Sequence, residues 1–163
     1  MLAPMRVRNA TIEDCEQIAD GMKTVVDEGR WLATESNTSA DVLVERFRGA
    51  VENPDHVLLV LVEADAPIGC IGLHPTHTKG VLLLGMWILP ERRGQGGGRM
   101  LVDAALEARP EDVHKIELEV FPDNSTAIGL YRSMGFEQEG VRRDHYRRLD
   151  GSLRSAVIMS RLF

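Results

Sequence analysis

The stretch from Pro90 to Met100, PERRGQGGGRM, constrains the fold more than any other part of the chain, because four of its eleven residues are glycine. An apolar run at residues 81–89 precedes it, and a run with helical spacing at residues 99–108 follows it. A glycine-rich connection from a strand to a helix exposes backbone N–H groups at the positive end of the helix, where a phosphate binds well. The stretch therefore predicts an anion-binding turn in an α/β fold, and the alternative is a flexible turn with ordinary surface arginines.

Two common phosphate-binding folds are excluded by the sequence. A P-loop needs Gly-Lys followed by Ser or Thr, and this triplet occurs nowhere in the chain. The dinucleotide fingerprint GxGxxG begins correctly at Gly94 and Gly96, but its last position holds Arg99. The glycines must therefore belong to a different architecture.

Hydrophobic periodicity predicts the order of the elements along the chain. We expect strands at residues 5–10, 56–65, 68–74, 81–89, 113–121, 136–148 and 152–162, and helices at residues 12–26, 40–51, 98–109 and 123–135. Ala66–Pro67 is expected to form the turn between the second and third strands, and Gly85 indicates a β-bulge in the fourth. The order predicts one α/β (α+β) domain over residues 1–163, with a mixed sheet of about seven strands flanked by about four helices.

Composition excludes several classes of protein. The chain has 163 residues and a net charge of −6, which argues against binding to nucleic acid or to a membrane surface. No apolar run approaches the ~20 residues of a membrane-spanning helix. The two cysteines are too few for a disulfide framework, so we expect a cytoplasmic protein. His74 and His77 have no further ligands nearby, so no metal site is expected.

Two segments together resemble the GCN5-related N-acetyltransferase (GNAT) superfamily. The first, WILPERRGQGGGRMLVDAAL, has the family's strand end in apolar–x–Pro and its Arg-Gly-x-Gly-x-Gly turn. The second, ELEVFPDNSTAIGLYRSMGFEQEG, has the family's sequence of a strand, an Asn, an apolar helix and Leu-Tyr-x-x-x-Gly-Phe. The matching residues of the second motif are Asn124, Leu130, Tyr131, Gly135 and Phe136. The two motifs stand in the family's order, and the predicted elements agree over almost the whole chain.

The resemblance implies the GNAT fold, with a splay between two central strands, and acetyl-CoA as co-substrate. The backbone N–H groups of the glycine turn would hold the pyrophosphate, and the strand end before it would pair with the pantetheine arm like an added strand. In this sequence the implied cofactor-binding residues are Trp87, Ile88, Arg93, Gly94, Gln95, Gly96, Gly97, Gly98 and Arg99, with Asn124 bonding the cofactor near the pantetheine.

Transfer of an acetyl group from a thioester to an amine needs an oxyanion donor, an acid for the leaving thiolate and a base for the amine. The resemblance assigns a backbone N–H near Trp87 or Ile88 as the donor and Tyr131 as the acid. Glu119 matches the proton acceptor of bacterial ribosomal-protein N-terminal acetyltransferases, which the C-terminal half resembles. The alternatives are a core tyrosine, a solvated strand glutamate and a mechanism with water as the base.

The segment at residues 27–35, DEGRWLATE, bears on the acceptor. The N-terminal half is similar to small-amine and amino-acid acetyltransferases, in which such a segment walls the acceptor pocket. Glu28 and Glu35 would then supply negative charge and Trp31 a cation–π face for an amine. The alternative is a solvated loop anchored by a buried Trp31.

The segment RRDHYRR, residues 142–148, is rich in arginine. A period of two places Arg142, Asp144, Tyr146 and Arg148 on one face of the strand expected there. One face would border the acceptor site or a dimer interface, and the alternative is a solvated edge strand. A homodimer is expected only by analogy with relatives.

The sequence thus predicts an acetyl-CoA-dependent N-acetyltransferase. It would act by direct attack, in a ternary complex, on a primary amine of a small molecule or amino acid. Two alternatives remain open: a protein N-terminus as the acceptor, and an acyl-CoA-binding module without turnover.

Overall fold

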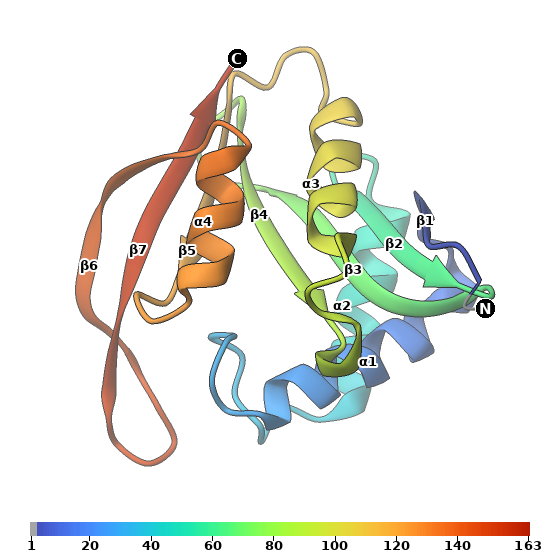
Figure 1. Cartoon of the computed structure of the whole chain (residues 1–163), viewed down its shortest axis with the longest axis horizontal. Helices are drawn as coiled ribbons and strands as arrows, with labels where there is room; N and C mark the ends of the chain where they lie inside the picture. The colour runs from blue at the N-terminus through green and yellow to red at the C-terminus, as the bar shows by residue number, and fades with distance from the viewer. Residues whose placement is uncertain (1–2) are drawn as a thin grey trace.

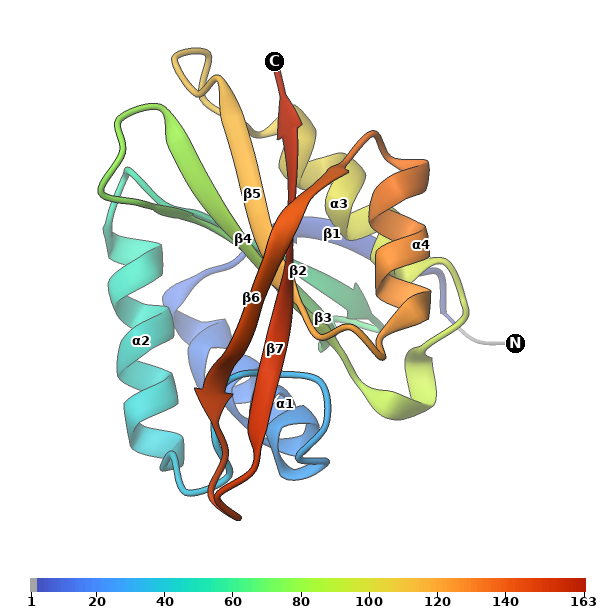
Figure 2. The same cartoon turned by 90° about the vertical axis from the view of Figure 1, so that its left-hand side faces the viewer.

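The computed structural model, which describes residues 3–163, has one seven-stranded sheet whose central strands are buried and whose last hairpin is largely exposed (Figures 1 and 2). The predicted order of elements is confirmed, with ends that differ by a few residues. The strands are β1 (Arg6–Asn9), β2 (Val57–Glu63), β3 (Ala66–Pro75), β4 (Val81–Ile88), β5 (Lys115–Val120), β6 (Glu137–Arg147) and β7 (Leu153–Leu162). The helices are α1 (Cys15–Asp27), α2 (Ala40–Glu52), α3 (Gly97–Glu107) and α4 (Ser125–Ser133).

The strands lie in the order β1-β2-β3-β4-β5-β7-β6, and the sheet divides at its centre. β4 and β5 run parallel and pair only from Val81 and Lys115 to Leu84 and Leu118. Beyond this point β4 stays paired with β3, and β5 stays paired with β7, so the two central strands part (Figure 1). The expected splay is therefore present and opens after Leu84.

The bulge expected at Gly85 is wrong. The register of β3 with β4 runs without interruption from Pro75 and Leu82 to Gly69 and Ile88. Gly85 marks instead the residue at which β4 loses its second neighbour, on the side of β5. The strands separate because they diverge, and no inserted residue is needed.

The turn between β2 and β3 also differs from the prediction. It lies at Ala64 and Asp65, whose φ angles are +48° and +65°, rather than at Ala66–Pro67. Positive φ at both central residues suits a two-residue hairpin turn. Pro67 lies inside β3 opposite Val62, next to a shift in the register of the two strands.

Helices cover both faces of the sheet, and each pair of helices has its own hydrophobic core. On one face, α3 and α4 cover Leu59, Leu61, Leu84, Leu118 and Val120. On the other face, α1 and α2 cover the alternate residues, among them Leu58, Val60, Cys70 and Trp87. Within residues 3–163, none of the helices combines the length and the apolar character that crossing a bilayer requires. The splay lies between the two cores and is open to both.

Candidate functional site

The four glycines of the turn serve two different purposes. Gly94 and Gly96 have φ angles of +73° and +87°, in the left-handed region that favours glycine. At Gly97 an added Cβ would lie 2.6 Å from Leu61 Cδ2, and at Gly98 it would lie 3.0 Å from a side-chain carbon of α4. The first two glycines shape the turn, and the other two let α3 approach β2 and α4 closely.

This turn presents a row of unused backbone donors. In the part of the chain that the structure describes, the N–H groups from Gly94 to Arg99 have no acceptor, and the first bonded amide is that of Met100, 3.2 Å from the Gly96 carbonyl oxygen. The Gln95 side chain folds back and donates to the Glu91 carbonyl oxygen at 3.2 Å. Consecutive free N–H groups at a helix N-terminus fit a pyrophosphate.

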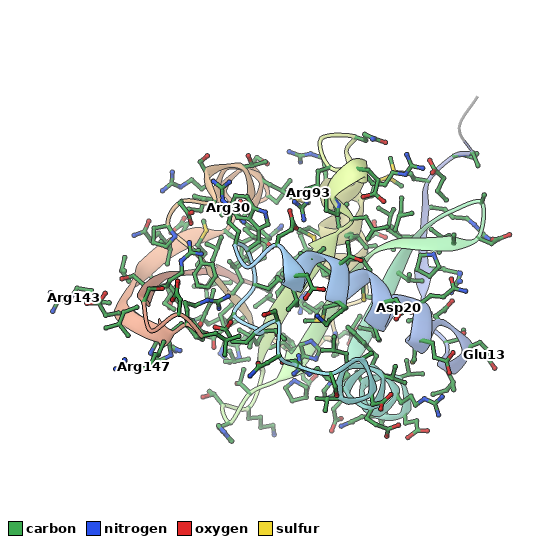
Figure 3. The ribbon with its side chains drawn as sticks, turned by 90° about the horizontal axis from the view of Figure 1, so that it is seen from below. Glu13, Asp20, Arg30, Arg93, Arg143 and Arg147 are labelled. Atoms are coloured by element: carbon green, nitrogen blue, oxygen red, sulfur yellow. The ribbon has the colours of Figure 1, made fainter. Side chains whose placement is uncertain are left out.

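The arginines of the turn contact the protein. Arg93 Nε donates to the Ile88 carbonyl oxygen at 3.2 Å, and its terminal nitrogens contact the two carboxylate oxygens of Glu28 at 2.9 and 2.6 Å. Arg99 Nη2 donates to Ser133 Oγ at 2.7 Å. The glycine turn is therefore tied to β4, to the end of α1 (Figure 3) and to α4.

The end of β4 offers backbone groups to the splay. Trp87 and Ile88 pair with Cys70 and Gly69 of β3 on one side, while their pairing with β5 has already ended. The Trp87 side chain is buried and packs on Gly21 of α1, where an added Cβ would lie 2.3 Å from the indole ring. Trp87 therefore faces the splay with its backbone, and an extended arm with amide groups fits beside it.

On the face of α1 and α2 the splay borders a cavity of about 350 Å³. Its walls come from both helices, the loop between them, β3, β4, β5 and β6, and they are mostly apolar. Among the described residues that line it, Glu119 is the one carboxylate and Arg46 the one guanidinium. A second cavity of about 30 Å³ lies beside Trp31 and shares Glu119 and Tyr146 with the first.

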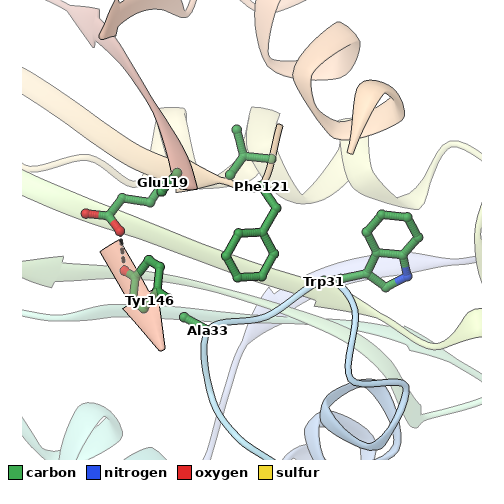
Figure 4. A pocket seen from close by; sticks show the side chains of 7 residues that line it. Trp31, Ala33, Glu119, Phe121 and Tyr146 are labelled. Atoms are coloured by element: carbon green, nitrogen blue, oxygen red, sulfur yellow. Dashed lines mark hydrogen bonds between the residues drawn. The ribbon is translucent and has the colours of Figure 1, made fainter. Parts of the chain in front are cut away.

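Glu119 reaches this cavity because β5 alternates. Ile116, Leu118 and Val120 are buried on the α3–α4 side, which turns Glu119 to the opposite face. Its carboxylate accepts hydrogen bonds from Arg142 Nη1 at 2.5 Å and from the Tyr146 hydroxyl (Figure 4). Burial, together with the hydrogen bond and the charge of Glu119, raises the pKa of Tyr146 to about 12. Two residues of β6 thus hold the carboxylate at the splay.

Tyr131 lies on the other face of the sheet. It is 6% exposed in the core beneath α3 and α4, with its ring 5.7 Å from that of Phe136. Burial raises the pKa of its hydroxyl. This packing is the one that a core tyrosine would have, and it places the side chain on the same face as the glycine turn.

Asn124 begins α4 as its N-cap. Its side-chain oxygen accepts a hydrogen bond from the Ala127 N–H at 3.2 Å. The carboxylate of the neighbouring Asp123 accepts a hydrogen bond from Arg154 Nη2 at 2.6 Å. The amide nitrogen of Asn124 is therefore the part of the side chain that could meet a cofactor.

Glu28 and Glu35, which were expected to wall the acceptor pocket, line neither cavity and form ion pairs with Arg93 and Arg148. The hydrogen bond and charge of Arg93 hold the pKa of Glu28 below its ordinary value. Glu35 Oε1 lies 3.0 Å from Nε of Arg148, whose side chain is 7% exposed. Trp31 lines the smaller cavity, with the Arg30 guanidinium 4.2 Å from its ring centroid. The aromatic residue faces a cavity, whereas both carboxylates hold arginines.

Residues 28–39, which we call the cover loop, are fastened to the hairpin of β6 and β7. Arg148 Nη1 donates to the carbonyl oxygens of Leu32 and Ala33 at 3.2 and 3.1 Å. Arg154 Nη1 donates to the Arg30 carbonyl oxygen at 2.7 Å. In Figure 1 the cover loop lies across the open end between the two parts of the sheet. The cover loop thus borders the cavity on the face of α1 and α2 through Leu32, Ala33 and Thr34.

Three residues of the cavity were given no role of their own by the sequence analysis, which named Tyr146 only as part of a strand face and His74 only when a metal site was considered. Tyr146 was placed by alternation on the same strand face as Arg142, and both contact Glu119 as that pattern indicates. Arg46 and His74 gave no signal, because a lone arginine on an amphipathic helix and a lone histidine in a strand have ordinary explanations. His74 Nδ1 lies 3.1 Å from His56 Nδ1, and burial, with the charges of His56 and Arg46, lowers the pKa of His74 to about 4.

The profile of the family described as Acetyltransferase (GNAT) family matches residues 23–136. The chain is 31% identical over 136 residues to the peptidyl-lysine N-acetyltransferase YjaB of Escherichia coli, across 82% of this chain and 83% of that protein. It is 38% identical over 82 residues to the N-alpha-acetyltransferase RimI of Mycobacterium tuberculosis, across 50% of this chain and 49% of that one. The structure of a GNAT superfamily phosphinothricin acetyltransferase from Sinorhizobium meliloti in complex with AcCoA has the same fold, with a TM-score of 0.84 at 20% identity, covering 98% of this chain and 88% of that chain.

Proposed function

The chain belongs to the acetyltransferase (GNAT) family and is an N-acetyltransferase whose acetyl donor is acetyl-CoA, and from that premise we propose that its acceptor is the primary amine of a small molecule or amino acid. The covered acceptor side supports this proposal. The cavity of about 350 Å³ is bounded by the cover loop, which Arg148 and Arg154 hold through backbone carbonyl groups. A cavity of this volume suits a small ligand, whereas a peptide needs an open groove.

On the donor face, main-chain groups do most of the binding. The free N–H groups from Gly94 to Arg99 hold the pyrophosphate, and Trp87 and Ile88 pair with the pantetheine arm. Asn124 donates to the cofactor near that arm. A backbone N–H near Trp87 or Ile88 stabilises the oxyanion that develops on the thioester carbonyl, a contribution typically worth ~3 kcal/mol for one donor. Acetyl-CoA supplies the activated acyl group.

On the acceptor face, Glu119 takes a proton from the attacking amine, directly or through water. The nitrogen bonds to the carbonyl carbon, the carbon–sulfur bond breaks, and the thiolate leaves. Tyr146 and Arg142 position the Glu119 carboxylate through their hydrogen bonds. Attack from this face on a carbonyl held in the splay needs no covalent acyl-enzyme.

Tyr131 protonates the leaving thiolate, because it lies on the donor face beside the core of α3 and α4. Burial raises the pKa of the Tyr131 hydroxyl, so it stays protonated at neutral pH and can donate to the sulfur as negative charge develops there. Tyr131→Phe preserves the contact with Phe136 and is expected to lower kcat by roughly 10²-fold. Full turnover in this variant would remove Tyr131 from the reaction.

A protein acceptor is the second candidate. It is supported by the names of the sequence relatives, which include a peptidyl-lysine and an N-alpha-acetyltransferase. It requires the cover loop to leave its contacts with β6 and β7, so that a peptide could enter. A non-catalytic acyl-CoA-binding module is the third, and the position of Glu119 in the cavity speaks against it.

The test is acetyl-CoA consumption, followed as release of free thiol with separate groups of acceptors: amino acids, polyamines, amino-phosphinates, lysine-containing peptides and ribosomal-protein N-terminal peptides. We expect thiol release with small amines that exceeds that with peptides. Release with peptides alone would replace the proposal by the protein-acceptor candidate. Tight acetyl-CoA binding by calorimetry without release from any acceptor would favour the non-catalytic module.

A further inference from the structure

The cavity on the acceptor face has its two charged groups on different walls. Glu119 stands on β5 at the splay, and Arg46 belongs to α2 and lies close enough to His74 of β3 for its charge to act on the imidazole. In the sheet, β4 separates β3 from β5. Neighbouring strands are ~4.8 Å apart, so the acidic and basic walls stand roughly two strand spacings from one another.

Glu119 and Arg46 differ in the hydrogen-bond and ion-pair partners that the protein gives them. Glu119 already accepts hydrogen bonds from Arg142 and Tyr146. Arg46 has one long contact, from Nη1 to Thr34 Oγ1 at 3.5 Å, and no Asp or Glu in residues 3–163 forms an ion pair with it. Arg148, beside the same loop, is by contrast paired with Glu35. Arg46 is an exposed, permanent cation that lines the cavity without a protein carboxylate.

On the wall of the cavity formed by α2 and β3, Arg46 is the positively charged group. His74 lines the same cavity, but burial lowers its pKa to about 4, so its imidazole is uncharged near neutral pH. Between the two walls lie Leu83, Gly85 and Trp87 of β4, which face this side of the sheet and form a mostly apolar floor. An acceptor that satisfies both walls carries an amine, an apolar body and an anion.

We propose that the acceptor is an amino acid with an apolar body, and that Arg46 binds its carboxylate while its amine faces Glu119. The inference rests on the proposed function and narrows its acceptor class. A guanidinium binds a carboxylate through two parallel hydrogen bonds, which fixes the orientation of the bound molecule. A polyamine would place a second cation beside Arg46, and a simple amine would leave the guanidinium unpaired.

The experiment compares acceptors that differ only in the carboxylate. L-leucine is paired with 3-methylbutylamine, L-methionine with 3-(methylthio)propylamine, and 6-aminohexanoate with pentylamine. We expect at least one amino acid to have a kcat/KM at least ~10-fold above that of its amine, because a hydrogen-bonded charged pair is lost in the amine. Arg46→Gln is expected to bring that amino acid to the level of its amine and to leave the amine unchanged.

Arg48→Gln is the matched control, because it removes the same charge two residues along α2. Arg48 Nη2 lies 3.9 Å from Glu16 of α1 and does not line the cavity. We expect Arg48→Gln to keep the preference for the amino acid, and Arg46→Lys to restore part of it. Because the amines report turnover independently of Arg46, a folding defect in either variant shows as a loss of amine turnover.

The outcomes separate this inference from the function on which it rests. Equal kcat/KM values within all three pairs, or equal effects of Arg46→Gln and Arg48→Gln, overturn the inference and leave small-amine acetylation standing. If only peptides release thiol, the proposed function fails, and calorimetry of the three amino acids in the presence of CoA then decides. Binding that weakens ~10-fold in Arg46→Gln supports the subsite, and no binding overturns it.

Discussion

The two faces of the sheet present different kinds of functional group at the same opening, the splay between β4 and β5. Beneath α3 and α4 the core is filled, and the functional groups are main-chain amides of a turn whose glycines are packed or left-handed. Beneath α1 and α2 the core is smaller, a cavity of about 350 Å³ remains, and the functional groups are side chains. The proposed donor site therefore depends on backbone geometry, whereas the proposed acceptor site depends on side chains and can change with single substitutions.

The largest expected effect is on the acceptor face. Glu119→Gln is expected to lower kcat by roughly 10²- to 10⁴-fold, because the base is lost. The KM for acetyl-CoA should stay unchanged if the groups on the two faces of the sheet act independently of one another. Steady-state thiol release over a range of acetyl-CoA concentrations, with the acceptor saturating, measures both quantities.

Glu117→Gln is the control for this substitution. Glu117 lies two residues earlier on the same face of β5, where its carboxylate is 3.8 Å from Lys115 Nζ. Its removal should leave kcat within ~2-fold of the wild type, the usual range for a polar surface change. A similar loss in both variants would mean that the strand, rather than the carboxylate at the splay, is what matters.

The second effect concerns the cover loop. Arg148→Gln removes the contacts to Leu32, Ala33 and Glu35 and is expected to lower the free energy of unfolding by ~2 to 3 kcal/mol. We also expect the KM of a small acceptor to rise while that of acetyl-CoA does not. Urea unfolding and initial rates measure the two effects.

Arg147→Gln tests whether the effects of Arg148→Gln come from the position of that arginine or only from the loss of a positive charge. Arg147 is exposed on β6 and points away from the molecule with Arg143 (Figure 3). Its loss should move the free energy of unfolding by less than ~0.5 kcal/mol. If it raises the acceptor KM as much as Arg148→Gln does, the hairpin acts through its charge and the cover loop is not held as described.

The third effect is on the donor face, where two glycines can be compared. Gly97→Ala is expected to lower the free energy of unfolding by ~1 to 3 kcal/mol, because the new Cβ overlaps Leu61. Gly94→Ala meets no atom within 4 Å but adopts a φ of +73°, which costs about 1 kcal/mol. Urea unfolding ranks the two, and the reverse order would mean that turn conformation outweighs helix packing.

The smallest effect is a pH-dependent one at the start of α1. Asp14 accepts hydrogen bonds from Arg8 at 2.6 and 2.9 Å. These bonds are the main reason why the pKa of Asp14 falls from 3.8 to about 2. A depressed pKa stabilises the fold above the unfolded value, so Asp14→Asn should lower the free energy of unfolding by ~1 kcal/mol at pH 7. The difference should vanish as the pH falls through 2.

Asp20→Asn is the control for the pH series. Asp20 is exposed on α1 (Figure 3), and its substitution removes one carboxylate from the same helix. Thermal unfolding between pH 2 and pH 7 should show a pH-dependent difference for Asp14→Asn alone. Parallel curves for the two variants would trace the effect to net charge and not to the contact with Arg8.

The fold was predictable because its signals are local. Period two along β5 and the glycines before α3 act within a few residues, and both were placed correctly. The hairpin turn at Ala64 and Asp65 was missed because neither residue is a glycine, although both have positive φ. A prediction from sequence patterns alone places such a turn at the nearest proline, which here is Pro67.

The site was predictable only where its residues are consecutive. The glycine turn is one continuous segment, so its donors could be recognised together. Glu28 and Arg93 are 65 positions apart, and nothing local indicates that an acid of the cover loop holds an arginine of the turn. Arg46 and Glu119 share a cavity only because α1, α2 and five strands, β2 to β6, meet there. Long-range pairing of this kind depends on packing that one sequence does not display.

The short pairing of β4 with β5 places an edge strand in the middle of the sheet. Interior strands usually protect their amides longest against exchange with water, whereas an exposed edge is where other chains add and aggregate. Beyond Leu84 the inner side of β4 has the hydrogen-bonding freedom of an edge. It lies inside the molecule, between α1 and α2 on one face and α3 and α4 on the other, so a narrow extended molecule that pairs there would complete the sheet from within.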